Sequence, residues 1–148
     1  MSIAAVSPSL IIAVSVQLLS QAFKVVYYSL KEGGLQLHRF VHPAGMPSAH
    51  AAFVAALTSA LAVYHGIGSD LFALSFVFSA IVIYDTLRLR GAVQVLCRLV
   101  DRLALKLPET EREAVPQYIG HNALEIAVGV VIGCVWGIGW SLVITPGW

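Results

Sequence analysis

Charged residues are scarce in this chain. They make up 11% of its 148 residues, against about 25% in an ordinary soluble domain. Hydrophobic residues make up 58%, and the mean hydropathy is +0.82. Disordered chains are polar and highly charged, so the composition excludes disorder. A chain of this size cannot hide so much apolar surface in one soluble core, which indicates an integral membrane protein.

Cysteine and net charge are also low. The two cysteines, Cys97 and Cys134, lie in stretches of different character and lack metal-type spacing, so we expect neither a disulfide nor a cysteine metal site. A net charge of +1 gives no case for nucleic acid as a partner. His38 and His42 have the spacing of a helical metal site but lie in a loop beside Pro43. We therefore expect no metal and no other cofactor.

Four apolar stretches are long enough to cross a bilayer, which takes about 20 residues for each helix. They cover approximately Ile3–Leu30, Pro47–Tyr64, Asp70–Leu87 and Asn122–Ile144. Leu35–Gly45 is too short and polar to span, and we expect an interfacial or re-entrant loop there. The sequence predicts an all-α integral membrane helical bundle of about four transmembrane helices, with one domain over residues 1–148.

A further helix is predicted over Gly91–Leu107. Its apolar side chains share one helical stripe and its charged side chains share the other. This pattern is typical of an amphipathic helix lying in the membrane surface. A helix packed on its own protein fits the pattern equally well.

Glycines recur at every fourth position of the last span, at Gly129, Gly133 and Gly137. This spacing lets membrane helices approach closely, although glycine is also simply frequent in such helices. If the chain forms a homo-oligomer or a complex with another membrane protein, we expect contact through this face.

The ionisable residues of the spans gather at span ends that four antiparallel helices place on one side of the membrane. They are Lys24, His50, Asp85, Arg88, Arg90, His121 and Glu125. Ionisable groups inside a membrane are costly and indicate function by default. The alternatives are that Lys24 extends to the headgroups and that Asp85 and Arg88 form an ordinary helix ion pair.

The segment Gly45–His50 has features of a phosphate site. A helix beginning at Pro47 presents N–H groups and a positive dipole end, which suit an anion. The hydroxyl of Ser48 adds a donor, and His50 is placed to protonate a leaving oxygen. The alternative is that Ser48 is only an N-cap and His50 only an interfacial residue.

His121 and Glu125 lie four residues apart, so a helix can place the carboxylate beside the imidazole. A carboxylate holding one ring nitrogen makes the other a better nucleophile or base. The alternative is a capping box of Asn122 and Glu125, which leaves His121 without a role.

Together, these residues resemble the divergent branch of the type 2 phosphatidic acid phosphatase and vanadium-dependent haloperoxidase superfamily. The motifs that carry the resemblance are Gln21-x-x-Lys24, Gly45-Met46-Pro47-Ser48-Ala49-His50, Tyr84-Asp85 followed by Arg90, and Gly120-His121 with Glu125 and Gly129. The resemblance implies metal-independent cleavage of a lipid phosphate or polyprenyl phosphate through a phosphohistidine.

The resemblance also assigns roles. His121 would be the nucleophile, Glu125 would orient it, and His50 would be the acid for the departing alcohol. The phosphate site would be formed by Lys24, Ser48, Asp85, Arg88 and Arg90.

The chain departs from the superfamily pattern at several positions. Val115 stands where the wider superfamily has a phosphate-binding Arg, Ala49 replaces a Gly, and the arginine region around Arg88 and Arg90 is shortened. The alternative function is therefore a non-catalytic, phosphatase-like membrane subunit that binds a phospholipid headgroup or a membrane-protein partner.

The basic residues predict an orientation. The four-span arrangement places all nine Lys and Arg on one side of the membrane, and short loops rich in Lys and Arg stay in the cytoplasm. We therefore expect the site to face the cytoplasm and both termini to lie on the opposite side. The membrane would be the inner membrane of a bacterium or an organelle membrane.

A cysteine introduced at Glu111 tests this orientation. We expect Glu111→Cys to resist an impermeant thiol reagent in intact cells and to react after lysis, with the parent chain labelled in parallel. Labelling before lysis would contradict a cytoplasmic site.

Overall fold

The computed structural model describes residues 6–35, 37–40, 45–104 and 123–144, without the side chains of 32, 38, 39, 89–94, 101 and 104. Helices and turns account for these ranges, and no strand occurs in them. The elements are α1 (Pro8–Glu32), the 3₁₀ helix η1 (Leu37–Phe40), α2 (Ala49–His65), α3 (Asp70–Ala104) and α4 (Ala123–Val143). The predicted all-α helical bundle is confirmed.

Three of these helices are long and apolar enough to cross a membrane, at Pro8–Lys31, Asp70–Arg88 and Ala123–Val143. The fourth, α2, is apolar but has 17 residues, which is the lower limit for a span. At 1.5 Å per residue its length is about 25 Å. The chain is therefore a membrane protein, and its predicted spans correspond to three long helices and a shorter one.

The helix ends follow from local capping. Gly33 ends α1 with φ +70°, a left-handed conformation that favours glycine, and its N–H bonds the carbonyl of Ser29. The predicted start of the second helix at Pro47 is two residues too early. The Oγ of Ser48 accepts the N–H of Ala51 at 3.4 Å, so Ser48 is the N-cap and α2 begins at Ala49.

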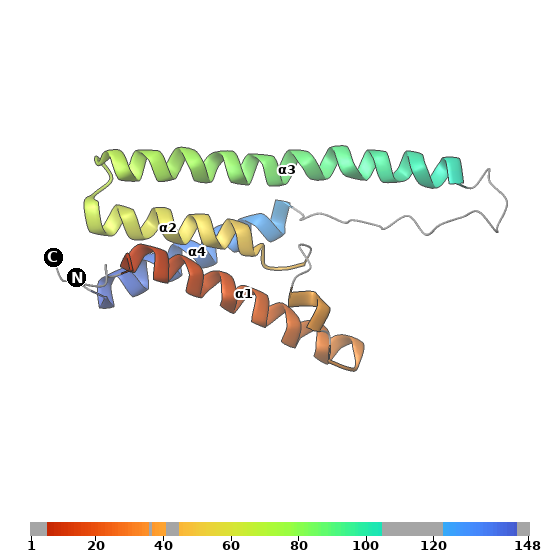
Figure 1. Ribbon diagram of the computed structural model, residues 1–148, viewed down its shortest axis with the longest axis horizontal. Coiled ribbons are helices and arrows are strands. Elements are labelled where there is room, and N and C mark those ends of the chain that lie inside the picture. Colours follow the sequence, from red (N-terminus) through yellow and green to blue (C-terminus); the bar gives the residue numbers. More distant parts are fainter. Residues whose placement is uncertain (1–5, 36, 41–44, 105–122, 145–148) are drawn as a thin grey trace.

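The third span and the predicted amphipathic helix are one continuous helix, α3, which is 35 residues long. The expectation of a separate interfacial helix over Gly91–Leu107 is therefore wrong within the described residues. Gly91 is the only strong helix breaker near the junction, and a single Gly costs a helix only about 1 kcal/mol. In Figure 1, the C-terminal part of α3 extends past the ends of the other helices.

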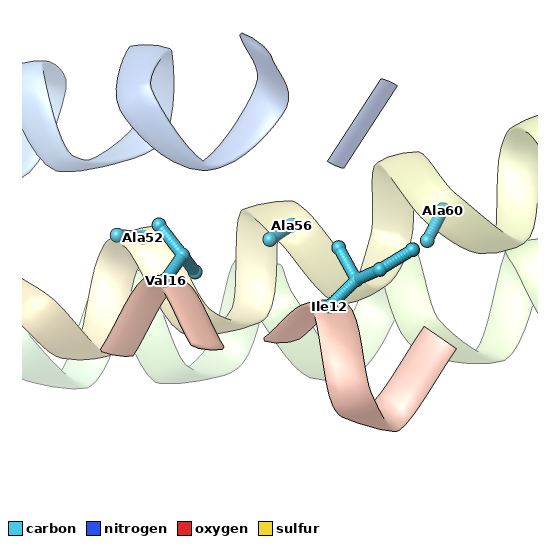
Figure 2. Packing of buried hydrophobic residues seen from close by; sticks show 5 residues of the cluster. All are labelled: Ile12, Val16, Ala52, Ala56 and Ala60. Carbon is cyan, nitrogen blue, oxygen red and sulfur yellow. The ribbon is translucent and has the colours of Figure 1, made fainter. Parts of the chain in front are cut away.

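The helix α2 lies at the centre and packs against α1, α3 and α4. Small buried residues on several sides of α2 allow this close packing. Figure 2 shows one of these contacts, in which Ile12 and Val16 of α1 lie against Ala52, Ala56 and Ala60 of α2. The core therefore consists largely of alanines of α2, whose small side chains let the backbones of neighbouring helices approach closely.

The closest of these approaches is between α2 and α4. Gly129, Gly133 and Gly137 are buried, and a Cβ at Gly129 or Gly137 would stand 2.5 or 2.6 Å from a backbone oxygen of α2. The facing pairs are Gly129 with Ser48, Gly133 with Ala52, and Gly137 with Ala56. The glycine face is therefore filled by α2 of the same chain. Whether the chain assembles with a partner stays a prediction.

Hydroxyl groups fix the register of α2 against α3. The Oγ of Ser79 donates to the carbonyl of Val54 at 3.1 Å, and Thr58 donates to the carbonyl of Ser75 at 3.2 Å. In this antiparallel register, each step towards the start of α2 is matched by a step towards the end of α3. Asp85 therefore lies level with Ser48.

The close approach predicts opposite effects of two Gly→Ala substitutions in α4. A Cβ at Gly133 meets the carbonyl of Ala52 and the Cβ of Ala55, whereas a Cβ at Gly139 meets nothing within 4 Å. We expect Gly133→Ala to destabilise the protein by about 1–3 kcal/mol. The matched control Gly139→Ala should be neutral or stabilising by about 0.5–1 kcal/mol. Thermal unfolding in detergent measures both, and equal shifts would contradict the packing.

Candidate functional site

A lysine is buried in a membrane-spanning helix at one end of the bundle. Lys24 lies in the second half of α1 and is 1% exposed. The end of α1 and the starts of α2 and α4 lie at this same end of the bundle (Figure 1). A charge in such a place is costly, so the protein must supply compensating groups.

One compensating group comes from α4. Glu125 lies in the first turn of α4, is partly buried, and attracts Lys24 electrostatically. The sequence places Lys24 and Glu125 about a hundred residues apart. Their approach depends on α4 lying beside both α1 and α2.

The start of α2 is joined to the same turn of α4. The backbone N–H of Ser48 donates to the carbonyl of Glu125 at 3.1 Å. Ser48 is fully buried, and its hydroxyl oxygen caps α2 by accepting from Ala51. The N-cap alternative for Ser48 is therefore confirmed as a structural role. The cap leaves the hydroxyl hydrogen of Ser48 able to donate to a further acceptor.

The loop before α2 is held against α1. Gly45 has φ +109°, and a Cβ there would stand 3.1 Å from both the ring and the hydroxyl of Tyr28. Any larger residue at position 45 would be strained and would also meet Tyr28. This glycine of the Gly-Met-Pro-Ser-Ala-His motif therefore has a packing role that lays the start of α2 beside α1.

The predicted acid and nucleophile are not seen together. His50 lies in the first turn of α2, and its side chain is exposed. His121 lies outside the described residues, two positions before α4 begins. The expected convergence of the two imidazoles on one pocket therefore stays a prediction.

Two predicted residues of α3, Asp85 and Arg88, have side chains that are not buried with Lys24 and Ser48. Asp85 and Arg88 are exposed, and the guanidinium of Arg88 lies 5.6 Å from the ring centroid of Tyr84. Among the described side chains, no ion pair joins Asp85 to Arg88. Arg88 makes a cation–π contact with Tyr84. Arg90 belongs to α3, but its side chain is not described.

Two polar residues of α1 close to Lys24 in the sequence are absent from the predicted site. Ser20 is buried one turn before Lys24, and the buried Oε1 of Gln21 has no hydrogen-bond partner in the described structure. In the sequence, Gln17, Gln21 and Lys24 lie on one face of a helix, and this polar stripe in an apolar span is the signal that could have added Gln21 to the predicted site. A buried amide without a partner costs stability, which is typical of groups that a ligand satisfies.

Metal binding has no support from the described side chains. No group of three His, Cys, Asp or Glu gathers among them. Metal-independent chemistry stays a prediction, because His121 and the residues around it lie outside these ranges.

The pairing of Lys24 with Glu125 predicts a double-mutant result. Lys24→Met leaves the partly buried Glu125 without its cation, so we expect a loss of stability of about 1–3 kcal/mol. Lys24→Met with Glu125→Gln removes both charges, so we expect it to recover much of the lost stability. Thermal unfolding in detergent measures both, with Lys31→Met in the exposed last turn of α1 as the control. Additive losses in the double variant would show that the two charges do not interact.

Comparison with known proteins identifies the family of the chain. A family model described as "Divergent PAP2 family" matches residues 6–136. The chain is also 29% identical to the uncharacterized membrane protein YuiD of Bacillus subtilis (strain 168), over 60% of this chain and 65% of that protein. The match thus spans just under two thirds of the relative's length. No solved structure matches significantly. Because the family model covers α1 to most of α4, including Lys24, Ser48 and Glu125, the chain belongs to the divergent PAP2 family.

Proposed function

We propose that the chain is a membrane phosphatase that hydrolyses a lipid phosphate or polyprenyl phosphate through a phosphohistidine. One observation carries the proposal. Lys24, 1% exposed inside a membrane helix, is attracted by Glu125, and the carbonyl of Glu125 accepts from the N–H of Ser48 at the start of α2. Membership of the divergent PAP2 family supports the same function.

These groups suit the binding of a phosphate at the membrane edge. The N-terminus of α2 presents backbone N–H groups and a positive dipole end, and Ser48 adds a hydroxyl. The ammonium of Lys24 adds a positive charge in a region of low dielectric, where electrostatic attraction is strong. Positive groups aimed at the phosphoryl oxygens stabilise the charge that develops during transfer.

The reaction has two steps. A ring nitrogen of His121 attacks phosphorus, the bond between phosphorus and the ester oxygen breaks, and the leaving oxygen takes a proton from His50. Water then attacks the phosphohistidine while giving a proton to His50, the bond between phosphorus and the ring nitrogen breaks, and inorganic phosphate leaves with both histidines regenerated. Glu125 acts as a positioning residue, because it follows His121 by four positions in the sequence.

In the proposed site, residues of α3 lie beside the start of α2. Asp85 lies level with Ser48 in the register of α2 and α3, and Arg88 follows one turn later. In the proposed mechanism Arg88 and Arg90 turn towards the phosphate when substrate binds. The exposed position of Arg88 leaves its side chain room for such a change.

Substitution of the two histidines tests this mechanism. We expect His121→Ala to abolish phosphate release from a panel of lipid phosphates by purified protein. His50→Ala should slow release by about 10²–10⁴-fold, most for poor leaving groups, because it removes the acid. Orthovanadate should inhibit, since it mimics five-coordinate phosphorus.

The matched control is His65→Ala, because His65 is exposed at the opposite end of α2. We expect its activity to equal that of the parent chain. Full activity in His121→Ala would rule out the phosphohistidine.

A second function is a non-catalytic subunit that binds a phospholipid headgroup. The exposure of Asp85 and Arg88 favours it, since neither contributes to the buried cluster in this structure. Under this alternative, a lipid phosphate raises the unfolding temperature of the protein through Lys24 but is never hydrolysed. Phosphate release from the panel therefore separates the two functions.

A further inference from the structure

An apolar groove opens between α1 and α4 on the lipid-facing side of the bundle. Its volume is about 290 Å³, which is at the lower end of the range for ligand pockets. Ser20 supplies the only polar side chain of its lining. The groove is lined by Val16, Leu19, Ser20, Phe23, Met46, Pro47, Val128, Ile132 and Trp136.

One end of this groove meets the candidate phosphate site. Phe23 precedes Lys24 in α1, and Pro47 precedes the buried Ser48. Val128 follows Glu125 by about one helical turn in α4. Ser20, which lines the groove, lies one helical turn before Lys24 on the same face of α1, so the groove reaches the residues beside the candidate phosphate site.

The other end of the groove is closed by an indole. The Nε1–H of Trp136 donates to the Oγ of Ser15 at 2.9 Å, and Ser15 in turn donates to the carbonyl of Ile12 at 2.8 Å. This chain of bonds holds the ring of Trp136 across the space between α4 and α1. From Val128 to Trp136 the groove follows α4 for about 12 Å.

We propose that this groove binds one hydrocarbon chain of the phosphorylated lipid, with the phosphate at Lys24 and the chain running towards Trp136. This inference rests on the proposed function and narrows its substrate to a lipid phosphate that places a single chain, alkyl or prenyl, between α1 and α4. The lining is apolar along its length, and the cation lies at one end, which matches an anionic headgroup on a hydrocarbon chain. A volume of about 290 Å³ suits one chain and not two side by side.

A second apolar pocket, between α2, α3 and α4, lacks this match. It has a volume of about 250 Å³ and is lined in part by Thr58, Ser79 and Cys134. The hydroxyls of Thr58 and Ser79 already bond one another and the backbone. None of its described lining residues is next to Lys24, Ser48 or Glu125 in the sequence, or one helical turn from them.

Photo-crosslinking tests the groove without requiring turnover. The probe is a hexadecyl phosphonate with a diazirine at about the tenth carbon, a distance from phosphorus that matches the length of the groove. The phosphatase reaction does not cleave its carbon–phosphorus bond. After irradiation of the full chain in detergent, we expect the label on Trp136, Ile132 or Val16 by mass spectrometry. Unlabelled hexadecyl phosphate should compete, and hexadecyl trimethylammonium should not.

Neighbouring substitutions in α4 provide the matched pair. Ile132→Trp fills the groove and should reduce labelling by about tenfold, which corresponds to losing the burial of a few methylenes. Val131→Trp places the same indole on the adjacent residue, which is 62% exposed and outside the groove, and should leave labelling unchanged. Equal labelling of both variants would overturn the proposal that the hydrocarbon chain binds in the groove.

Trp136→Leu gives an independent measurement, because it opens the closed end without blocking the groove. Phosphate release from octyl, dodecyl and hexadecyl phosphate should shift towards the longer chains, through a lower KM and an unchanged kcat. An unchanged chain-length preference overturns the role of Trp136 as the end of the groove.

These experiments separate the inference from the proposed function. Labelling in the groove without phosphate release overturns the phosphatase and supports the groove as a lipid-phosphate site. Phosphate release with labelling near Thr58 and Ser79, or with no preferred position, supports the phosphatase and overturns the groove. Labelling outside the groove together with no phosphate release overturns both.

Discussion

The arrangement of the whole bundle depends on how closely α4 approaches α2. Three buried glycines of α4 lie on the backbone oxygens of α2, with no side chain between them. In a membrane, helices gain little from the hydrophobic effect when they associate, and close packing is a main source of stability. The spacing of one glycine per turn keeps the two helices in contact from Gly129 to Gly137. A shift of one residue would replace these glycines with larger side chains and separate the helices.

The same contact determines the chemistry at the end of the bundle. Because Gly129 lies against the carbonyl of Ser48, the preceding turn of α4 reaches the N-cap of α2. The Ser48 N–H then bonds the Glu125 carbonyl, and the Glu125 carboxylate lies near Lys24. A buried cation and a helix N-terminus are thus both linked to Glu125, because two backbones pack without side chains between them. The cost of burying Lys24 is offset locally by Glu125.

Much of this structure could be predicted from the sequence, and the exceptions have physical reasons. Apolar run length predicts the spans, and Gly33 and Ser48 predict helix ends, because these signals are local. The sequence also groups Lys24 with Glu125, since both are ionisable residues in apolar stretches. The continuity of α3 was missed because the change from apolar to amphipathic pattern at Arg88 alters what surrounds the helix, not its backbone. The periodicity of apolar residues indicates what surrounds a helix, whereas a Pro or a pair of Gly indicates where a helix ends.

The groove was missed for a different reason: no motif encodes it. Its lining comes from three separate parts of the chain, and its closed end depends on a bond between Trp136 and Ser15, which are 121 residues apart. An indole N–H in an apolar environment must find an acceptor, so Trp136 predicts some partner but not which one.

The position of α3 explains why the groove opens where it does. α3 packs on α2 and not on α1 or α4 to a comparable extent, so it covers the side of α2 away from the groove. In the first half of α1, Ser15 bonds Trp136 of α4 and joins the two helices. Nearer to Lys24, Met46 and Pro47 line the groove together with residues of α1 and α4. The two helices are therefore separated next to Lys24, where the chain enters α2. In the groove that we propose, a hydrocarbon chain would enter from the side of the bundle, and its headgroup would stay at the membrane edge.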